Sequence, residues 1–363
     1  MKIIQTYSWP RQTPCSQIIE NRIKELARRG HTIEVLVHSS NGMAQRLNRP
    51  ENHINVQTSR FALGSSLTLP VKIQKMLSEN HDSMTVIHCP TLQLANFAIM
   101  ASKATGSRAR IILEPRLGIP PKDDAMSRLV LSQIDALILP SQTDADILMG
   151  SGACISAEKV HVLYPGVSLP DKIAVDNTHG KECSDGLTLI WAGEITPGCG
   201  LDTLVEALGS GHRMKIKLIV CGQGQGRYVM PIIRRSRSLG IAERIEWAGD
   251  TAPTPSMLEK ADGGLITAPH DPDAIAAAAH YMAYGLPVIW ADGTLAREFV
   301  MPDVNGIISG HGIDDWRDAI HSLIHDSEKQ HQLANDVRSK AKAQFDIQEH
   351  INQLTKIYLG LGF

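Results

Sequence analysis

The sequence predicts an α/β protein with two doubly wound domains, and three observations support this prediction. With 363 residues, 43% of them hydrophobic, the chain can bury two cores of ordinary size. Short apolar runs typical of buried strands alternate with longer amphipathic stretches typical of helices. The alternation stops in the polar, aperiodic segment 169–186 and then resumes. We therefore expect one domain at 1–168, a linker at 169–186 and a second domain at 187–346.

The first half begins with an apolar strand at Lys2–Thr6. Thr13 and Pro14 then combine a helix cap with a proline at the first helical position. This helix is expected to run to about Arg29, where Gly30 ends it. The further strands predicted in this half are 32–38, 85–88, 110–113, 136–139 and 159–163, and the further helices are 71–77, 93–104 and 125–133.

The second half repeats the pattern after the linker. Its predicted strands are 187–192, 215–221, 245–247, 264–266 and 286–290, and its predicted helices are 201–208, 228–239, 255–260 and 274–283. Because helices separate the strands, both sheets should be parallel. A last helix follows a break at Asp346, and we expect residues 347–363 to cross back to the first domain.

The stretch Asp262–Gly293 forms the clearest strand-helix-strand unit. Its strand leads through a polar bend, which contains Asp271, into an alanine-rich helix that begins after Asp273. Such a helix presents unpaired N–H groups and a positive dipole end at the carboxyl edge of a sheet, where anions bind. We therefore expect a phosphate at the backbone amides of Asp273, Ala274 and Ile275. The alternative is that the two aspartates only cap the helix.

Other loops at the carboxyl ends of predicted strands add candidate binding residues. Ligands of open parallel sheets bind at that edge, so the loop after the first strand is one such position. Glycines after the strands 187–192 and 215–221 would let backbone N–H groups approach a phosphate. The loop candidates are Trp9, Arg11 and Gln12 in the first half, and Gly193, Gly222 and Gly224 in the second.

Composition excludes several classes of protein. No apolar run reaches the length of a membrane span, and the start of the chain has no cleavage site, so we expect a cytoplasmic protein. The six cysteines show no CxxC spacing, which favours reduced thiols over disulfides or a structural metal, and no cofactor is expected.

Charge is distributed unevenly between the two halves. The net charge is −2, yet basic residues exceed acidic ones in the first half and the reverse holds in the second. Lys72, Lys75, Arg108 and Arg110 contribute to the basic excess. It predicts an anionic or membrane-held partner, with peripheral contact at the inner face of the membrane and no nucleic acid. The alternative is an ordinary solvated surface.

Several separate segments carry a family resemblance. In the second half they are CGLDTLVEAL, IVCGQGQG, IEWAGD and HYMAYGLPVI with REFV and NGII; in the first half they are ILPSQTDADIL and KVHVLYPGV, and the closing helix adds Tyr358. In order and spacing these segments resemble glycosyltransferase family 4, whose members have the GT-B fold. The resemblance implies two Rossmann-like domains facing across a cleft, with a nucleotide-sugar donor held mainly by the second and the acceptor by the first. It also implies transfer with retention to a glycan, lipid-linked or small-molecule acceptor.

The chain departs from the family pattern at the positions that recognise phosphate and sugar. Glu194 and Cys199 stand where the family has an arginine and a lysine that neutralise the donor diphosphate. The paired glutamates of the family fall on Pro272 and His280. A first-domain histidine is replaced within Glu114–Arg116.

Two interpretations follow from these departures. In the first, the protein is an active transferase with a rebuilt donor site, in which His280 meets the ribose and Arg11, Arg116 or Arg227 restores positive charge. In the second, the protein binds or regulates another transferase, and His280 is a core histidine. The resemblance then implies three groups of candidates: catalytic Glu114, Arg116 and Asp271; donor-binding Gly193, Glu194, Cys199, Gly222, Gly224, Asp273, Ala274, Ile275 and His280; and acceptor-side Trp9, Arg11 and Gln12.

Overall fold

The chain divides into two compact units in a computed structural model. Unit 1 comprises Met1–Arg11, Ile19–Tyr164 and Gln348–Phe363, and unit 2 comprises Gln12–Ile18 and Pro165–Ile347. The structure describes residues 1–7, 12–38, 42–49, 54–59, 68–78, 84–115, 124–170, 186–210, 215–268, 273–302, 304–324 and 327–362.

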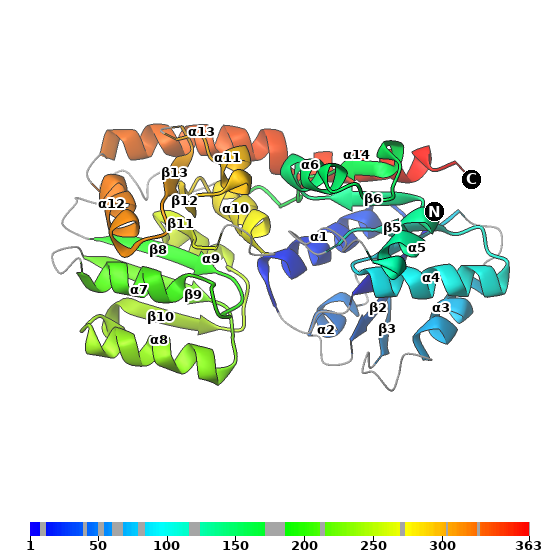
Figure 1. The fold of residues 1–363 in the computed structure, drawn as a ribbon, viewed down its shortest axis with the longest axis horizontal. Coiled ribbons are helices and arrows are strands. Elements are labelled where there is room, and N and C mark those ends of the chain that lie inside the picture. The colour runs from blue at the N-terminus through cyan, green and yellow to red at the C-terminus, as the bar shows by residue number, and fades with distance from the viewer. Residues whose placement is uncertain are drawn as a thin grey trace. The chain divides into compact units, whose positions relative to one another are not determined.

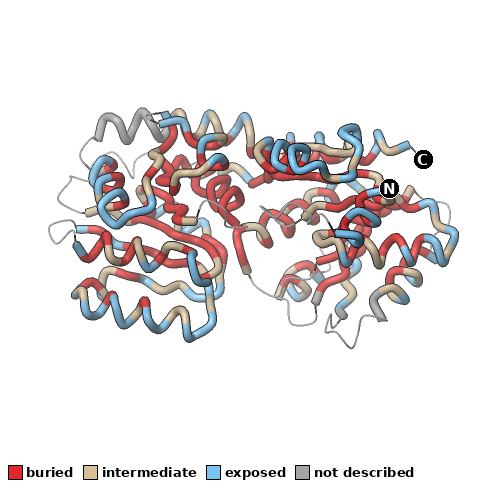
Figure 2. The backbone as a smooth tube through the Cα atoms, in the orientation of Figure 1, coloured by how far each residue is buried: buried red, intermediate tan, exposed pale blue. Residues whose placement is uncertain are grey.

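Unit 1 is built on a parallel sheet of seven strands in the order β3-β2-β1-β4-β5-β6-β7 (Figure 1). Its inner strands are buried along their length, because helices cover both faces (Figure 2). The strands are β1 Lys2–Tyr7, β2 Thr32–His38, β3 Ile54–Ser59, β4 Thr85–Cys89, β5 Arg110–Leu113, β6 Ala136–Leu139 and β7 Val160–Val162. The helices are α1 Pro14–Arg28, whose first turn is counted in unit 2, α2 Met43–Leu47, α3 Thr68–Ser78, α4 Leu92–Thr105, α5 Ala125–Gln133, α6 Gln142–Gly150 and α14 Ile347–Gly360.

Unit 2 is built on a parallel sheet of six strands in the order β10-β9-β8-β11-β12-β13. Apolar residues of α7, α8 and α12 form the core on one face, while α10 packs against β11, β12 and α13 (Figure 1). The strands are β8 Leu187–Ala192, β9 Ile216–Cys221, β10 Ile245–Gly249, β11 Gly263–Ile266, β12 Val288–Ala291 and β13 Gly306–Ser309. The helices are α7 Leu201–Ser210, α8 Gly226–Ser238, α9 Pro255–Lys260, α10 Ala274–Ala283, α11 Thr294–Phe299, α12 Ile313–Ile324 and α13 Ser327–Phe345.

The predicted fold class is confirmed by these two sheets with their flanking helices. In both sheets the strand order reverses direction, between β1 and β4 in unit 1 and between β8 and β11 in unit 2. Ligands of doubly wound sheets bind outside the carboxyl ends of the strands at such a reversal. None of the helices in the described ranges has the length and hydropathy needed to cross a membrane.

Most predicted elements agree with the structure to within a few residues, and the differences have local causes. The strand predicted from Leu286 begins at Val288, because Leu286 N–H bonds back to Tyr281 in the C-terminal turn of α10 and Pro287 has no N–H. The strand predicted at 159–163 is shorter in the structure, where β7 spans Val160–Val162, because Ala157–Lys159 forms a 3-10 turn. Seven elements were not predicted from the sequence: β3, β13, α2, α6, α11, α12 and α13.

Candidate functional site

The glycine loops of unit 2 pair with each other at the carboxyl ends of β8 and β9. Gly193 N–H donates to the Cys221 carbonyl (3.1 Å), and Ile195 N–H donates to the Gln223 carbonyl (3.1 Å). Gly222 N–H donates in turn to the Gly249 carbonyl (2.8 Å). The amides of Gly193 and Gly222 are therefore already bonded within the protein, although the sequence suggested them as phosphate donors.

Close packing of the two loops explains why glycine occupies two of these positions. A Cβ atom on Gly222 would lie 1.9 Å from the Gly193 carbonyl oxygen, and one on Gly224 would lie 2.1 Å from the Ile195 carbonyl oxygen. Gly222 also has a φ of +145°, which other residues rarely adopt. Gly193, Gly222 and Gly224 thus allow the two loops to pack backbone against backbone, and we call these paired loops the glycine frame.

Glu194 and Cys199, where the resemblance implies an arginine and a lysine, lie on the loop between β8 and α7. Glu194 is half-buried there, and Cys199 is buried in the apolar core. A chain of polar contacts fixes the Cys199 backbone: Trp191 Nε1–H donates to Thr267 Oγ1 (2.8 Å), and Thr267 Oγ1–H donates to the Cys199 carbonyl (2.5 Å). Thr267 follows β11, so this chain spans the strand reversal. The reversal therefore carries a glutamate and a cysteine at the two positions where the resemblance implies cations.

Asp273 occupies the N-cap position of α10 at this reversal, but its side chain makes no capping hydrogen bond and instead points to the first turn of another helix. Its Oδ1 accepts a hydrogen bond from the backbone N–H of Cys15, the second residue of α1 (3.2 Å), and the residue is fully buried. The carbonyl of Asp273 accepts the first helical bond of α10, from Ala277. The N–H groups of Ala274 and Ile275 therefore have no partner in their own helix. Both residues are buried in this structure.

His280 lies two helical turns after Asp273 and also contacts the first turn of α1. Its ring donates a hydrogen bond to the backbone of Pro14, while desolvation lowers the pKa of His280 to about 4, so the ring is neutral. Nε2 is buried and finds no partner within the described ranges. The same turn of α1 is closed by a reciprocal cap, in which Thr13 and Ser16 each accept from the backbone of the other.

In unit 1, Glu114 directly follows β5 and is held by two buried side chains. Arg22 Nη1, on α1, lies 2.9 Å from Oε1 and 2.7 Å from Oε2. His88 Nε2, on β4, lies 2.6 Å from Oε2. Burial would raise the pKa of Glu114, but the charge of Arg22 and the contact with His88 hold the pKa well below its usual range. The carboxyl is therefore ionised and cannot serve as a general acid.

Further polar groups extend this cluster to α14. Tyr358 Oη lies 3.0 Å from His88 Nδ1, and Gln5 Oε1 accepts from Arg22 Nη2 at 3.4 Å. His350 Nδ1 lies 2.7 Å from the Tyr164 carbonyl oxygen. Arg22, His88 and His350 were not among the site residues predicted from the sequence. The one available signal was that His88 sits inside a strand whose other residues are apolar or small.

The remaining candidates are placed less fully. Gln12 is half-buried just before the cap of α1. Trp9, Arg11, Arg116 and Asp271 lie outside the described residues, so their candidate roles stay predictions.

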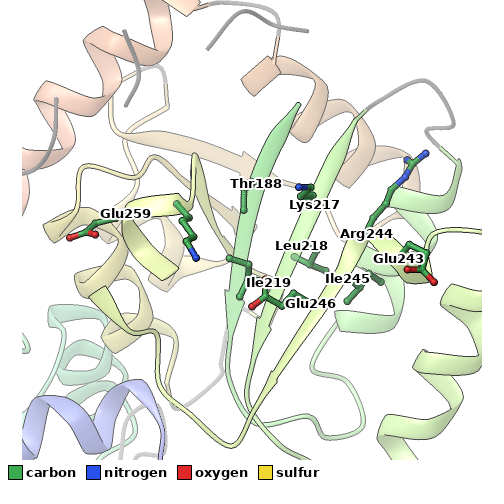
Figure 3. Close-up of a pocket in the computed structure, with 10 residues that line it drawn as sticks. Thr188, Lys217, Leu218, Ile219, Glu243, Arg244, Ile245, Glu246 and Glu259 are labelled. Carbon is green, nitrogen blue, oxygen red and sulfur yellow. The ribbon is translucent and has the colours of Figure 1, made fainter. Parts of the chain in front are cut away.

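A shallow hollow on unit 2 lies away from these loops (Figure 3). It is lined by the amino-terminal halves of β8 and β9, the start of β10 and the end of α9, and so faces away from the carboxyl edge. Its charged residues balance: Lys217, Arg244 and Lys260 against Glu243, Glu246 and Glu259. Neither its place nor its charge favours an anionic ligand.

Comparisons with known proteins agree with this architecture. Residues 16–170 match the family model Glycosyltransferase Family 4, and residues 179–340 match the model Glycosyl transferases group 1. No curated protein sequence matches the chain.

Solved structures with the same fold cover almost the whole chain. Anabaena HepE in complex with UDP-glucose has a TM-score of 0.80 at 18% identity, covering 98% of each chain. A glycosyltransferase from Rickettsia africae has a TM-score of 0.80 at 13% identity, covering 99% of this chain and 98% of that one. The sucrose-phosphate synthase of Thermosynechococcus elongatus has a TM-score of 0.77 at 14% identity, covering 99% of each chain. With both family models matched in order along most of its length, the chain belongs to the group 1, family 4 glycosyltransferases, which are transferases of the GT-B fold.

Proposed function

We propose that the protein transfers a glycosyl group from a nucleotide sugar, with a UDP-sugar as the first candidate. The observation that carries this proposal is the strand reversal between β8 and β11, where the glycine frame and the start of α10 come together. HepE, whose fold this chain shares, was crystallised with UDP-glucose. A nucleoside diphosphate at the same edge would meet the amides of Ala274 and Ile275 with its phosphates.

The charge of that diphosphate must be neutralised by residues other than Glu194 and Cys199. We assign this role to Arg11, Arg116 or Arg227, each of which follows a predicted strand in the sequence. Arg227 is the one among them that the structure describes; it is exposed at the start of α8, directly after the Gly222–Gly226 turn. His280 is assigned to the ribose and Asp271 to the reacting sugar.

The acceptor is a glycan, a lipid-linked sugar or a small molecule held by unit 1, and the transfer retains the anomeric configuration. Trp9, Arg11 and Gln12 are assigned to the acceptor side. The basic excess of the first half supports peripheral contact with an anionic membrane surface, which a flotation assay with anionic and neutral liposomes at low salt would test.

A thermal-shift panel of UDP-, GDP-, ADP- and CMP-sugars tests the donor. A ligand present at 100 times its Kd should stabilise the fold by about 2.7 kcal/mol, which corresponds to a shift of a few degrees. The donor that shifts the melting temperature is then supplied for transfer, and release of the nucleoside diphosphate is measured. Stabilisation by no nucleotide sugar in the panel would overturn the proposal.

The burial of Cys199 favours a second candidate function, in which the protein binds or regulates another transferase. A lysine at this position would have to extend from an apolar core, whereas the cysteine that is present packs within that core and brings no cation. This function predicts no shift with any nucleotide sugar, together with a second transferase whose activity depends on the presence of the protein.

A further inference from the structure

The polar residues around Glu114 share one face of the unit 1 sheet. Gln5 is paired in register with His88, and His88 with Ile112. Side chains alternate between the two faces along a strand, so Glu114, two residues after Ile112, continues the row to which Gln5 and His88 belong. This row ends at the carboxyl edge of β1, β4 and β5, where the strand order reverses.

Among the described residues, two side chains contact the Glu114 carboxylate, those of Arg22 and His88. Arg22 has only donors. His88 is neutral, because burial lowers its pKa, so one ring nitrogen carries the proton. A lone pair on Nε2 at 2.6 Å from an ionised oxygen would be repelled, and therefore the proton is on Nε2. Nδ1 then accepts from the hydroxyl of Tyr358. The polar contacts run in one direction, from the Tyr358 hydroxyl through His88 to the Glu114 carboxylate.

Exposure distinguishes Glu114 from its partners. Arg22, His88 and Tyr358 are each at most 1% exposed, whereas the Glu114 side chain is 25% exposed. Within the described ranges, Oε2 is contacted by both Arg22 and His88, while Oε1 has one contact, from Arg22. A carboxylate oxygen has room for two donors, so Oε1 can accept one more. An uncharged hydroxyl group suits this acceptor position on Oε1, since the charge of Glu114 is already balanced by Arg22.

We propose that Tyr358 and His88 are positioning residues that hold Glu114 as the acceptor of a hydrogen bond from a substrate hydroxyl group. This inference rests on the proposed function. The hydroxyl belongs to the transferred sugar or to the acceptor. In both cases the C-terminal helix contributes to transfer through a tyrosine that does not itself touch the substrate.

Tyr358→Phe tests the relay, by which we mean the series of contacts from Tyr358 through His88 to Glu114. Thr355→Val is the matched control. Thr355 lies on the same helix, and its buried Oγ1 finds no partner in the described part of the chain. Tyr358→Phe should lower kcat by about threefold to tenfold, the value of one hydrogen bond, and should change the donor KM by less than about twofold. Thr355→Val should leave both constants unchanged. Equal behaviour of the two variants would overturn the inference.

A double-mutant cycle separates positioning from a structural effect. In a Glu114→Gln background, Tyr358→Phe should have no further effect, because the tyrosine acts through Glu114; additive losses would contradict the relay. If Glu114→Gln fails to fold because it leaves the charge of Arg22 buried, Glu114→Asp provides the background. Nitrogen-15 spectra of histidine-labelled protein, assigned with His88→Gln, should show His88 protonated at Nε2. Protonation at Nδ1 would overturn the inference.

Two further measurements show which molecule carries the hydroxyl group, and whether a negative result contradicts the proposed function or only this inference. If Tyr358→Phe slows donor hydrolysis by water as much as it slows transfer, the hydroxyl is on the transferred sugar; if it slows transfer alone, the hydroxyl is on the acceptor. A wild-type protein that moves no sugar from any donor in the panel would defeat the proposed function. Wild-type transfer that Tyr358→Phe leaves unchanged would defeat this inference alone.

Discussion

Asp273 and Cys15 join two helix starts: the Asp273 carboxylate, at the start of α10, accepts a hydrogen bond from Cys15 N–H, at the start of α1. A negative side chain thus lies where a donor phosphate would be stabilised by the α10 dipole. Asp273→Asn keeps the acceptor oxygen and removes the charge. We expect it to bind UDP about fivefold more tightly, equivalent to roughly 1 kcal/mol, as measured by isothermal titration calorimetry. Weaker binding by a folded variant would show that Asp273 itself contacts the ligand.

The loop frame predicts opposite effects for two neighbouring glycines. Gly224→Ala would place Cβ against the Ile195 carbonyl oxygen and should lower the free energy of unfolding by about 1–3 kcal/mol. Gly226→Ala is the matched control, because a Cβ there meets nothing within 4 Å; it should be neutral or stabilising by up to about 1 kcal/mol. Urea denaturation measures both. Equal effects would contradict the role of Gly224 in the frame.

Two buried histidines predict a loss of stability in acid. Burial lowers the pKa of both His280 and His350 to about 4, below the ordinary value of 6.5. The unfolded chain therefore takes up protons before the folded one. The stability that depends on these neutral rings is complete above about pH 6.5 and falls as the pH drops towards 4, by about 3 kcal/mol for each histidine.

The pH dependence of the urea midpoint measures this effect. His280→Gln should make the decline between pH 6.5 and 4 shallower, whereas His311→Gln, at an exposed position, should leave it unchanged. A midpoint that stays constant down to pH 4.5 in the wild type would be incompatible with buried neutral rings.

Charge reversal at Glu194 should strengthen donor binding. Glu194→Arg exchanges repulsion for a charge-assisted hydrogen bond and is expected to raise the affinity for UDP about tenfold. Glu243→Arg makes the same change of net charge in the hollow away from the reversal, and should change the affinity by less than about twofold.

Cys199→Lys should instead destabilise the fold, because it buries a charge in the apolar core. If Glu194→Arg abolished an existing activity, Glu194 would belong to a rebuilt site.

Helix caps and apolar runs were sufficient to predict most of the elements. The Thr13 cap and the proline after it are confirmed, as are strands such as Arg110–Leu113 and Leu187–Ala192. The edge strand Ile54–Ser59 was missed because its sequence, INVQTS, is mostly polar, and Ile54 and Val56 are too short an apolar pattern to stand out. Such strands have fewer apolar neighbours, so their sequences carry a weaker signal.

The candidate site was less predictable, because it depends on partners far apart in the chain. Arg22 reads as a polar residue on an amphipathic helix, and nothing near it in the sequence indicates a bond to Glu114. The sequence places a glycine-rich turn after a strand, and we expected a phosphate to approach Gly222 and Gly224 there. The structure shows the facing loop there instead.

The paired loops after β8 and β9 also limit which substitutions this edge of the sheet can accept. The backbone there is bonded to itself, and a Cβ atom at Gly222 or Gly224 would collide with the carbonyl oxygen of the facing loop. Glu194 adjoins Gly193 on the first of these loops, and Cys199 lies in the apolar core. A substitution at Gly222 or Gly224 would therefore disturb the backbone of this edge, whereas a substitution at Glu194 would change its charge.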